Sequence, residues 1–179
     1  VDPTYVGNVI TISGTPTATG TFNYTITPTG CATTATGVIT VNPRPDQSVV
    51  TAGDNSRCGT GTVALTVSNL PAGTTADWYS ASTGGVVLAG GSATTSYTTA
   101  SILSTTIYYV EIRNTTTGCV STSRVPVTAT VNTNPDQSGV TAGDNSRCGT
   151  GTVALTVSNL PAGTTADWYS ASTGGVVLA

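Results

Sequence analysis

The chain is 179 residues long, and charged residues make up only 7% of it. It has five basic and eight acidic residues, no His and a formal net charge of -3. Nucleic-acid binding is disfavoured because no basic stripe could displace counterions from phosphates, and a His-assisted catalytic triad is excluded. The acidic residues are scattered, so we expect no enzyme active site. No apolar run reaches the roughly 18–20 residues of a membrane helix.

One stretch of the sequence occurs twice. Residues 45–89 return as residues 135–179, ninety positions later, and the two copies differ only where Val49 becomes Gly139. A period of about 90 residues is the length of one small β-sandwich module. A catalytic site needs one optimised geometry, whereas repetition supplies length and valency, so the repeat predicts a modular surface or fibre protein.

The repeat also divides the chain. We expect the second half of one module at 1–43, a complete module at 44–134 and the first half of a repeated module at 135–179. A half module cannot bury both faces of its sheets, so the outer segments are expected to complete their sandwiches with further chain. The junction at 42–45 is short and contains Pro, which predicts a semi-rigid rod.

Apolar residues alternate with polar ones along most of the chain, as in half-buried strands. In the opening segment a strand is predicted at Thr21–Ile26, and a later one ends at Val41-Asn42. In the complete module, strands are predicted at Gln47–Ala52, Val63–Val67, Ala76–Ser80, Val86–Leu88, Ser96–Ile102, Thr106–Arg113 and Val120–Asn132, with a polar turn at Gly53–Ser56. This pattern predicts an all-β fold of tandem immunoglobulin-like β-sandwich modules of about 90 residues.

Trp78 lies in the middle of a predicted strand and is expected in the core, together with Tyr108 and Val110. Its copy, Trp168, is expected in the core for the same reason. The alternative for Trp78 is a platform on which a sugar ring stacks, with Tyr79, Tyr97 and Tyr109 as further candidate carbohydrate contacts.

The four cysteines are Cys31, Cys58, Cys119 and Cys148. Their spacing does not fit a zinc site, but their regular placement suggests disulfides formed in an oxidising, extracytoplasmic place. One hypothesis is a Cys58–Cys119 bond within the module, although standard immunoglobulin topology places these positions more than ~20 Å apart. The other is a bond from Cys58 to the late cysteine of the next module. The sequence leaves both open.

Calcium is the metal to consider, because modular surface proteins often stiffen their junctions with it. The candidate ligands are Asp46 and Asp54, which recur as Asp136 and Asp144. A motif of three closely spaced acidic ligands is missing, and Asp54-Asn55-Ser56 fits an Asx-type turn. We therefore expect no cofactor, with calcium as the alternative.

Several motifs resemble the repeats of very large bacterial surface proteins that are exported by the type IX secretion system, including the giant adhesins of gliding motility. In the opening segment the motifs are Ile12–Thr25, Thr29-Gly30-Cys31 and Thr36–Val41. In the complete module, the motifs Asp77–Ala81, Tyr108–Glu111 and Thr117–Val120 are similar to the immunoglobulin-like and PKD-like repeats of the same proteins. The resemblance implies a cell-anchored or secreted filament that mediates attachment and, in gliding cells, is moved along the surface.

The leading interpretation is thus a structural stalk or filament segment of an extracellular bacterial adhesin, located at the cell surface. Its expected partners are neighbouring modules of the same chain or fibre, and surface polysaccharide is a further candidate. The alternative is a carbohydrate-binding or spacer module of a secreted enzyme. A covalent array and a polymer of subunits are equally compatible with the sequence.

Overall fold

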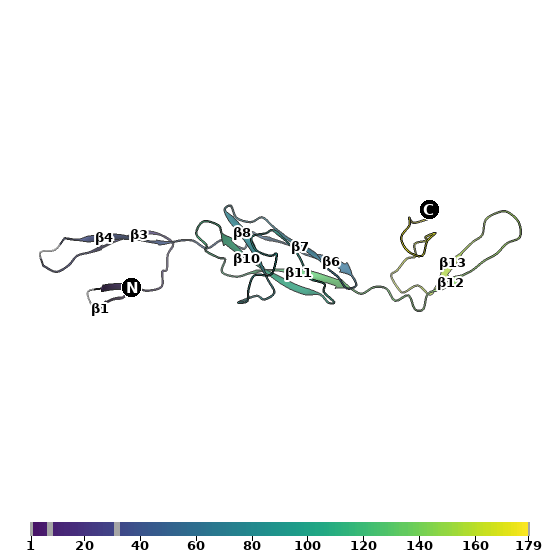
Figure 1. The fold of residues 1–179 in the computed structure, drawn as a ribbon, viewed down its shortest axis with the longest axis horizontal. Coiled ribbons are helices and arrows are strands. Elements are labelled where there is room, and N and C mark those ends of the chain that lie inside the picture. Colours follow the sequence, from purple (N-terminus) through teal and green to yellow (C-terminus); the bar gives the residue numbers. More distant parts are fainter. Residues whose placement is uncertain (1, 7–8, 31–32, 179) are drawn as a thin grey trace. The chain divides into compact units, whose positions relative to one another are not determined.

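The computed structural model describes residues 2–6, 9–30 and 33–178, which form thirteen β-strands and no helix (Figure 1). No helix in this described part of the chain is therefore long and apolar enough to cross a lipid bilayer. The chain is all-β, as its Thr-rich composition and its alternating apolar residues predict. It divides into two compact units, Val1–Val131 and Asn132–Ala179.

The first 42 residues contain two antiparallel hairpins. In the first, β1 (Asp2–Val6) pairs with β2 (Val9–Ser13). In the second, β3 (Gly20–Ile26) pairs with β4 (Ala35–Val41), so that Phe22 faces Ile39. Phe22 is 45% exposed and Ile39 is 43% exposed. The second hairpin therefore has an uncovered apolar face.

Residues 45–132 form a sandwich of two sheets (Figure 1). The smaller sheet has the order β5 (Thr51–Gly53), β7 (Ala64–Ser68), β9 (Ser96–Thr98). The larger sheet has the order β6 (Asn55–Cys58), β11 (Val125–Asn132), β10 (Thr106–Asn114), β8 (Thr74–Tyr79). β10 pairs antiparallel with both β8 and β11. The larger sheet thus joins strands from the beginning and the end of the module.

The core lies between these two sheets. Alternate residues of β7 and β10 point into it, as the period of two predicts: Leu65 and Val67 from one sheet, Tyr108, Val110 and Ile112 from the other. Trp78 is completely buried among them. Its indole Nε1 donates a hydrogen bond to the carbonyl oxygen of Thr94 at 2.9 Å, so the one polar atom of the ring is satisfied.

Three predicted strands, Gln47–Ala52, Ser96–Ile102 and Val120–Asn132, are shorter in the structure, as Thr51–Gly53, Ser96–Thr98 and Val125–Asn132. Two further predicted elements differ in kind. The segment expected to be a polar turn instead continues into β6, because β11 supplies a neighbouring strand. The Asp54 carboxylate fastens this contact by accepting a hydrogen bond from the Thr128 backbone N–H at 2.7 Å. Conversely, Val86–Leu88 forms no strand. Val86 is 83% exposed, and the segment is held by a hydrogen bond from Leu88 N–H to the carbonyl oxygen of Trp78 at 2.8 Å.

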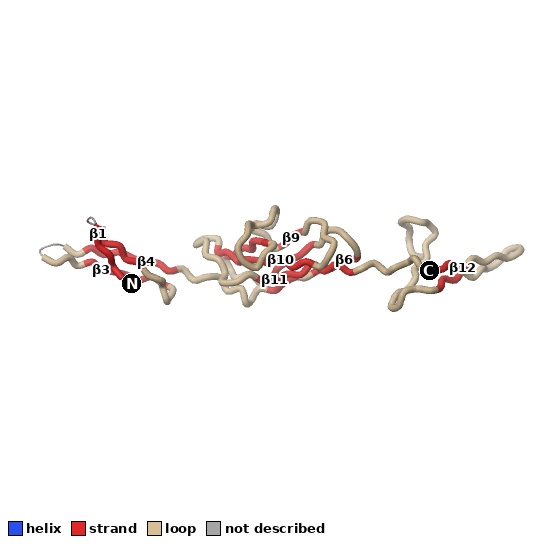
Figure 2. Tube along the Cα trace, turned by 90° about the horizontal axis from the view of Figure 1, so that it is seen from below, coloured by secondary structure: helices blue, strands red, loops and turns tan. Residues whose placement is uncertain are grey.

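The second unit has little regular structure, although its sequence copies residues 45–89. β12 (Thr141–Gly143) pairs with β13 (Thr156–Ser158), just as β5 pairs with β7 in the complete module. Residues 145–148 and 164–169, the copies of β6 and β8, contain no strand, although Tyr169 forms an isolated β-bridge with Val177. Most of this unit is therefore drawn as loop in Figure 2. We refer to residues 45–89 as the covered copy, to residues 135–179 as the uncovered copy and to residues 90–132 as the covering segment.

Candidate functional site

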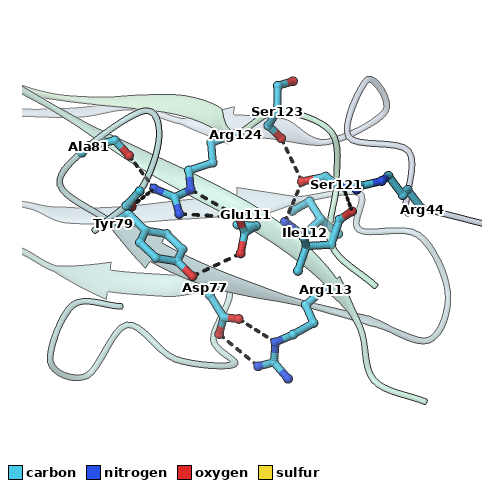
Figure 3. Close-up of polar contacts among 12 residues, drawn as sticks. Arg44, Asp77, Tyr79, Ala81, Glu111, Ile112, Arg113, Ser121, Ser123 and Arg124 are labelled. Carbon is cyan, nitrogen blue, oxygen red and sulfur yellow. Dashed lines mark hydrogen bonds and ion pairs between the residues drawn. The ribbon is translucent and has the colours of Figure 1, made fainter. Parts of the chain in front are cut away.

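Charged residues gather on the outer face of the larger sheet, where the covered copy meets the covering segment (Figure 3). Asp77 of β8 lies opposite Glu111 of β10, and Arg113 follows two residues later. Arg113 Nε donates to Asp77 Oδ2 at 2.7 Å, and its Nη2 donates to Oδ1 at 3.2 Å. The backbone N–H of Ala93 and the hydroxyl of Ser92 also donate to Asp77 Oδ1.

These contacts decide the charge of Asp77, which is only 3% exposed. Burial by itself would raise the pKa of this carboxyl. The hydrogen bonds from Arg113 and Ala93, together with the Arg113 charge, outweigh burial and hold the pKa of Asp77 below its usual value. The hydrogen bonds to Asp77 raise the pKa of Arg113 in turn. The pair is ionised at neutral pH and clamps β8 to β10.

A second cluster lies beside the first. The Tyr79 hydroxyl donates to Glu111 Oε1 at 3.1 Å, and the Arg124 guanidinium lies 3.3 Å from the centre of the Tyr79 ring. Arg124 Nε is 3.5 Å from Glu111 Oε2. Its Nη1 donates to the carbonyl oxygens of Ala81 and Gly84 at 2.7 and 2.8 Å. Burial and the neighbouring Glu111 raise the pKa of Tyr79, so the phenol stays protonated.

The chemistry of these clusters is structural. Asp77 and Glu111 are register partners on β8 and β10, and each carboxylate is neutralised by its own arginine, Arg113 or Arg124. No buried side-chain nitrogen or oxygen among the described residues lacks a hydrogen-bond partner. Together, the two clusters hold residues 45–89 against residues 90–132, the two halves of the module.

The chain enters and leaves this module at opposite ends. At the entry, Arg44 Nη1 donates to the carbonyl oxygen of Val120 at 3.2 Å, and Gln47 donates to the hydroxyls of Thr122 and Ser123. These contacts precede β11, which ends at Asn132, where the chain leaves. Eight strand residues at ~3.3 Å each separate the two ends.

The candidate calcium ligands do not come together. Asp46 accepts a hydrogen bond from Ser48 N–H and Asp136 accepts one from Ser138 N–H, each closing a local turn. Hydrogen bonds from these serines lower the pKa of both carboxyls. The Asp54 carboxylate instead accepts a hydrogen bond from the backbone N–H of Thr128 in β11. In the part of the chain that the structure describes, no three acidic, His or Cys residues gather as metal ligands would.

Of the two disulfide hypotheses, the Cys58–Cys119 bond within the module does not fit the structure. Cys58, Cys119 and Cys148 are unpaired thiols, and Cys31 lies outside the described residues. The N–H of Asn114, at the end of β10, donates to the carbonyl oxygen of Cys119. Cys58 ends β6 and lies near Gly61, which pairs with Ile102 before β10 begins. The nine residues of β10 therefore separate the two cysteines by roughly 25 Å, whereas a disulfide requires Cα atoms within ~7 Å.

The expectation that Trp168 lies in a core also needs correction. Trp168 is 40% exposed, whereas Trp78, in an identical local sequence, is 0% exposed. Trp78 owes its burial to the strands of residues 90–132, and the described residues place no equivalent strands beside Trp168. Among the candidate carbohydrate contacts, Tyr79 is covered by Arg124 and Tyr97 stacks on Trp78 with ring centres 5.6 Å apart. Tyr109 remains half-buried.

A comparison with protein families identifies the module. Residues 45–133 match the family model described as an Ig-like domain, CHU_C associated. These residues form an Ig-like domain. The match supports a domain of the kind found in surface proteins of Bacteroidetes, which is a non-catalytic type of module. A search of curated proteins found no match to the chain.

Sequence reasoning missed the Asp77–Arg113 pair and the cluster around Arg124. A signal for the first existed, because Asp77 and Tyr79 alternate with Trp78 just as Glu111 and Arg113 alternate with Val110. Opposite charges on neighbouring strands favour pairing. Which two strands are neighbours was not apparent from the sequence, so the signal could not be used.

Proposed function

We propose that this chain is a stalk or filament segment of an extracellular bacterial adhesin, built from Ig-like modules, that holds an attachment site away from the cell surface. The observation that carries the proposal is the course of the chain through the complete module. It enters beside Val120 and leaves at Asn132, at the far end of β11. Modules connected in this way add length with each repeat.

The near-identity of residues 45–89 and 135–179 supports the same function. Duplicating a module changes the length of a stalk without changing its chemistry. The Asp77–Arg113 ion pair joins the two halves of the complete module. Arg124 joins them through the Tyr79 ring and the carbonyl oxygens of Ala81 and Gly84, and such contacts suit a scaffold. Export by type IX secretion and a role in gliding motility are part of the proposal and rest on the resemblance of residues 12–25 and 77–81.

The carbohydrate-binding alternative draws less support from the module. A sugar-binding platform needs exposed aromatic faces, and the rings of Trp78, Tyr79 and Tyr97 are engaged by protein atoms. Of the four candidate aromatic residues, only Tyr109 would remain to contact a sugar ring. We therefore favour the stalk over a polysaccharide-binding module, and over a spacer in a secreted enzyme.

The remaining disulfide hypothesis fits a stalk. Cys58 lies toward the exit of the module and Cys119 toward its entry, so we propose that Cys58 bonds the late cysteine of the following module. Two thiols would lose two electrons and two protons to an extracytoplasmic thiol–disulfide oxidoreductase. Alkylation followed by mass spectrometry of protein taken from cells should find Cys58 in an inter-module disulfide. Fully alkylated Cys58 would rule this bond out.

The test of the stalk is immunogold electron microscopy of intact producer cells, with an antibody raised against residues 45–134. We expect label at regular intervals along fibres that project from the cell. Label that follows soluble or polysaccharide-bound enzyme and leaves the cell surface bare would instead favour the spacer or carbohydrate-binding function.

A further inference from the structure

β8 is an edge strand of the larger sheet, because β10 pairs with it on one side only. Its other edge is nevertheless closed by backbone groups that belong to no strand. The N–H of Thr94 donates to the carbonyl oxygen of Ala76 at 2.9 Å. The N–H of Trp78 donates to the carbonyl oxygen of Gly91, and the carbonyl oxygen of Trp78 accepts from the N–H of Leu88, each at 2.8 Å. The free edge of β8 therefore has its hydrogen-bonding groups already engaged.

A buried carboxylate holds the segment that closes this edge, residues 88–94, which we call the strap. Asp77 Oδ1 accepts a hydrogen bond from the N–H of Ala93 at 2.8 Å and one from the Ser92 hydroxyl at 3.3 Å. Ala93 has a φ of 51°, in the left-handed region that residues other than Gly seldom occupy. Such a conformation persists only where surrounding contacts fix it. The Asp77 carboxylate supplies those contacts.

The strap lies close against β8. A Cβ atom at Gly91 would be 2.8 Å from the Cβ of Trp78, so a larger residue at this position would push the strap away. The strap also meets the indole ring, because Nε1 of Trp78 donates to the carbonyl oxygen of Thr94 at 2.9 Å. The backbone edge of β8 and the polar atom of its tryptophan are thus covered by one segment.

We propose that the strap, held by Asp77, is an autoinhibitory contact that prevents β8 from pairing with β8 of a second copy of this chain. An open sheet edge is a template on which another chain can add a strand. Two β8 edges are self-complementary, because an antiparallel pair centred on Asp77 joins Ala76 of each molecule to Trp78 of the other. Asp77 opposes this pair a second time, since two like charges would meet at its centre.

The repeated sequence gives the chain a reason to protect this edge. Residues 74–79 return unchanged as residues 164–169, so one chain carries the same edge sequence more than once. Linked copies of one sequence have a high effective concentration for each other, and misassembly between neighbouring units is a characteristic failure of repeat proteins. The strap acts within a single Ig-like domain and does not depend on the proposed stalk function.

The first test opens the strap in the intact chain with Ala93→Pro. Proline lacks the N–H that reaches Asp77 and cannot adopt a positive φ, and Ala93 is exposed, so the change removes no core side chain. Ala93→Gly is the matched control, because it keeps the N–H and tolerates the left-handed conformation. We expect the Trp78 amide to exchange with solvent about tenfold faster or more in Ala93→Pro and to remain protected in Ala93→Gly.

The amide of Ile112, which donates to the hydroxyl of Ser121 in the core, shows whether the domain is still folded and should stay protected in both variants. Gly91→Ala opens the strap in another way, by contact with Trp78, and serves as a second variant. Unchanged protection of Trp78 in a folded Ala93→Pro chain would refute the role of Asp77 in holding the strap.

The second test measures association by sedimentation velocity. Ala93→Pro and Gly91→Ala should dimerise at concentrations about tenfold or more below those at which Ala93→Gly does, because only they expose the β8 edge. In a mixture of isotope-labelled and unlabelled Ala93→Pro chains, intermolecular nuclear Overhauser effects should join Ala76 to Trp78. Association equal to that of Ala93→Gly would refute the autoinhibitory role, and dimers without contacts between the two β8 strands would refute β8 as the pairing edge.

Discussion

At the scale of residues, Trp78 and Trp168 show that a neighbouring segment determines whether a side chain is buried. Their local sequences are identical from residue 50 to 89 and from residue 140 to 179, but one indole is in a core and the other is 40% exposed. Burial of a tryptophan removes a large apolar surface from water and fills a cavity that no other side chain occupies. The contribution of each tryptophan to stability should differ accordingly.

The first prediction compares the two positions. Trp78→Ala should lower the free energy of unfolding of the Ig-like domain by about 3–5 kcal/mol, because it removes a buried ring and leaves a cavity. Trp168→Ala should change it by less than about 0.5 kcal/mol, as a surface substitution does. Urea unfolding followed by far-ultraviolet circular dichroism measures both at a concentration where the chain is monomeric. Equal losses would contradict the core assignment of Trp78.

The second prediction concerns Asp77 and pH. Its pKa is lowered in the folded domain, so the carboxylate stabilises the fold above the unfolded pKa, near 3.9, and this contribution disappears as pH falls through the lower folded value. Asp77→Asn should cost about 1–3 kcal/mol at pH 7 and flatten the fall in stability below about pH 4. Asp167→Asn, the same change in the uncovered copy, should do neither. An unchanged acid slope in Asp77→Asn would show that other carboxyls cause it.

At the scale of elements, strands exist where a partner strand is present. β5 and β7 pair within the covered copy, and their counterparts β12 and β13 pair within the uncovered copy. β6 and β8 pair with strands of the covering segment, and residues 145–148 and 164–169 remain irregular. Propensity is the same in the two copies, so the available hydrogen-bonding partners account for the difference.

Hydrogen exchange provides the third prediction. The backbone N–H of Trp78 donates to the carbonyl oxygen of Gly91 at 2.8 Å inside the domain and should exchange roughly 10³-fold or more slowly than that of Trp168. Val50 and Val140 are the control, since each donates to a glutamine three residues earlier at 3.2 and 3.1 Å. NMR-detected exchange resolves the individual amides. Similar protection of Trp78 and Trp168 would mean that the uncovered copy is folded.

At the scale of the whole molecule, the proposed stalk function requires the Ig-like domain to carry load. The chain enters near Val120 and leaves at Asn132, so a pulling force acts along β11 and its neighbours. β6 lies beside β11, and the arrows of the two strands end toward the same end of the domain in Figure 1. Extension therefore has to shear this contact before the core opens.

Force spectroscopy tests this load-bearing role as the fourth prediction. Pulling the monomeric chain by its two ends should give one major unfolding event, with a contour-length gain of roughly 300 Å for about 88 residues at 3.3–3.6 Å each. The uncovered copy should extend without a comparable event, because its core residues are exposed. Trp78→Ala should lower the unfolding force, whereas Trp168→Ala should not. Two events of similar force would contradict this description.

The sequence by itself determined the all-β class, the module of about 90 residues and the inward face of β7 and β10. These features depend on local alternation and on turn residues, which act over a few positions. It also determined that the chain lacks the residues of a catalytic triad. The family match at residues 45–133 agrees with this reading of the fold.

Only the tertiary structure decided the rest. It made a strand of residues 55–58, left Val86–Leu88 irregular, separated Cys58 from Cys119 and joined Asp77 to Arg113. Each of these outcomes depends on which distant segment lies alongside, and identical sequences at Trp78 and Trp168 therefore have different environments. A strand and a core need partners from elsewhere in the chain, and local sequence does not say whether those partners are in place.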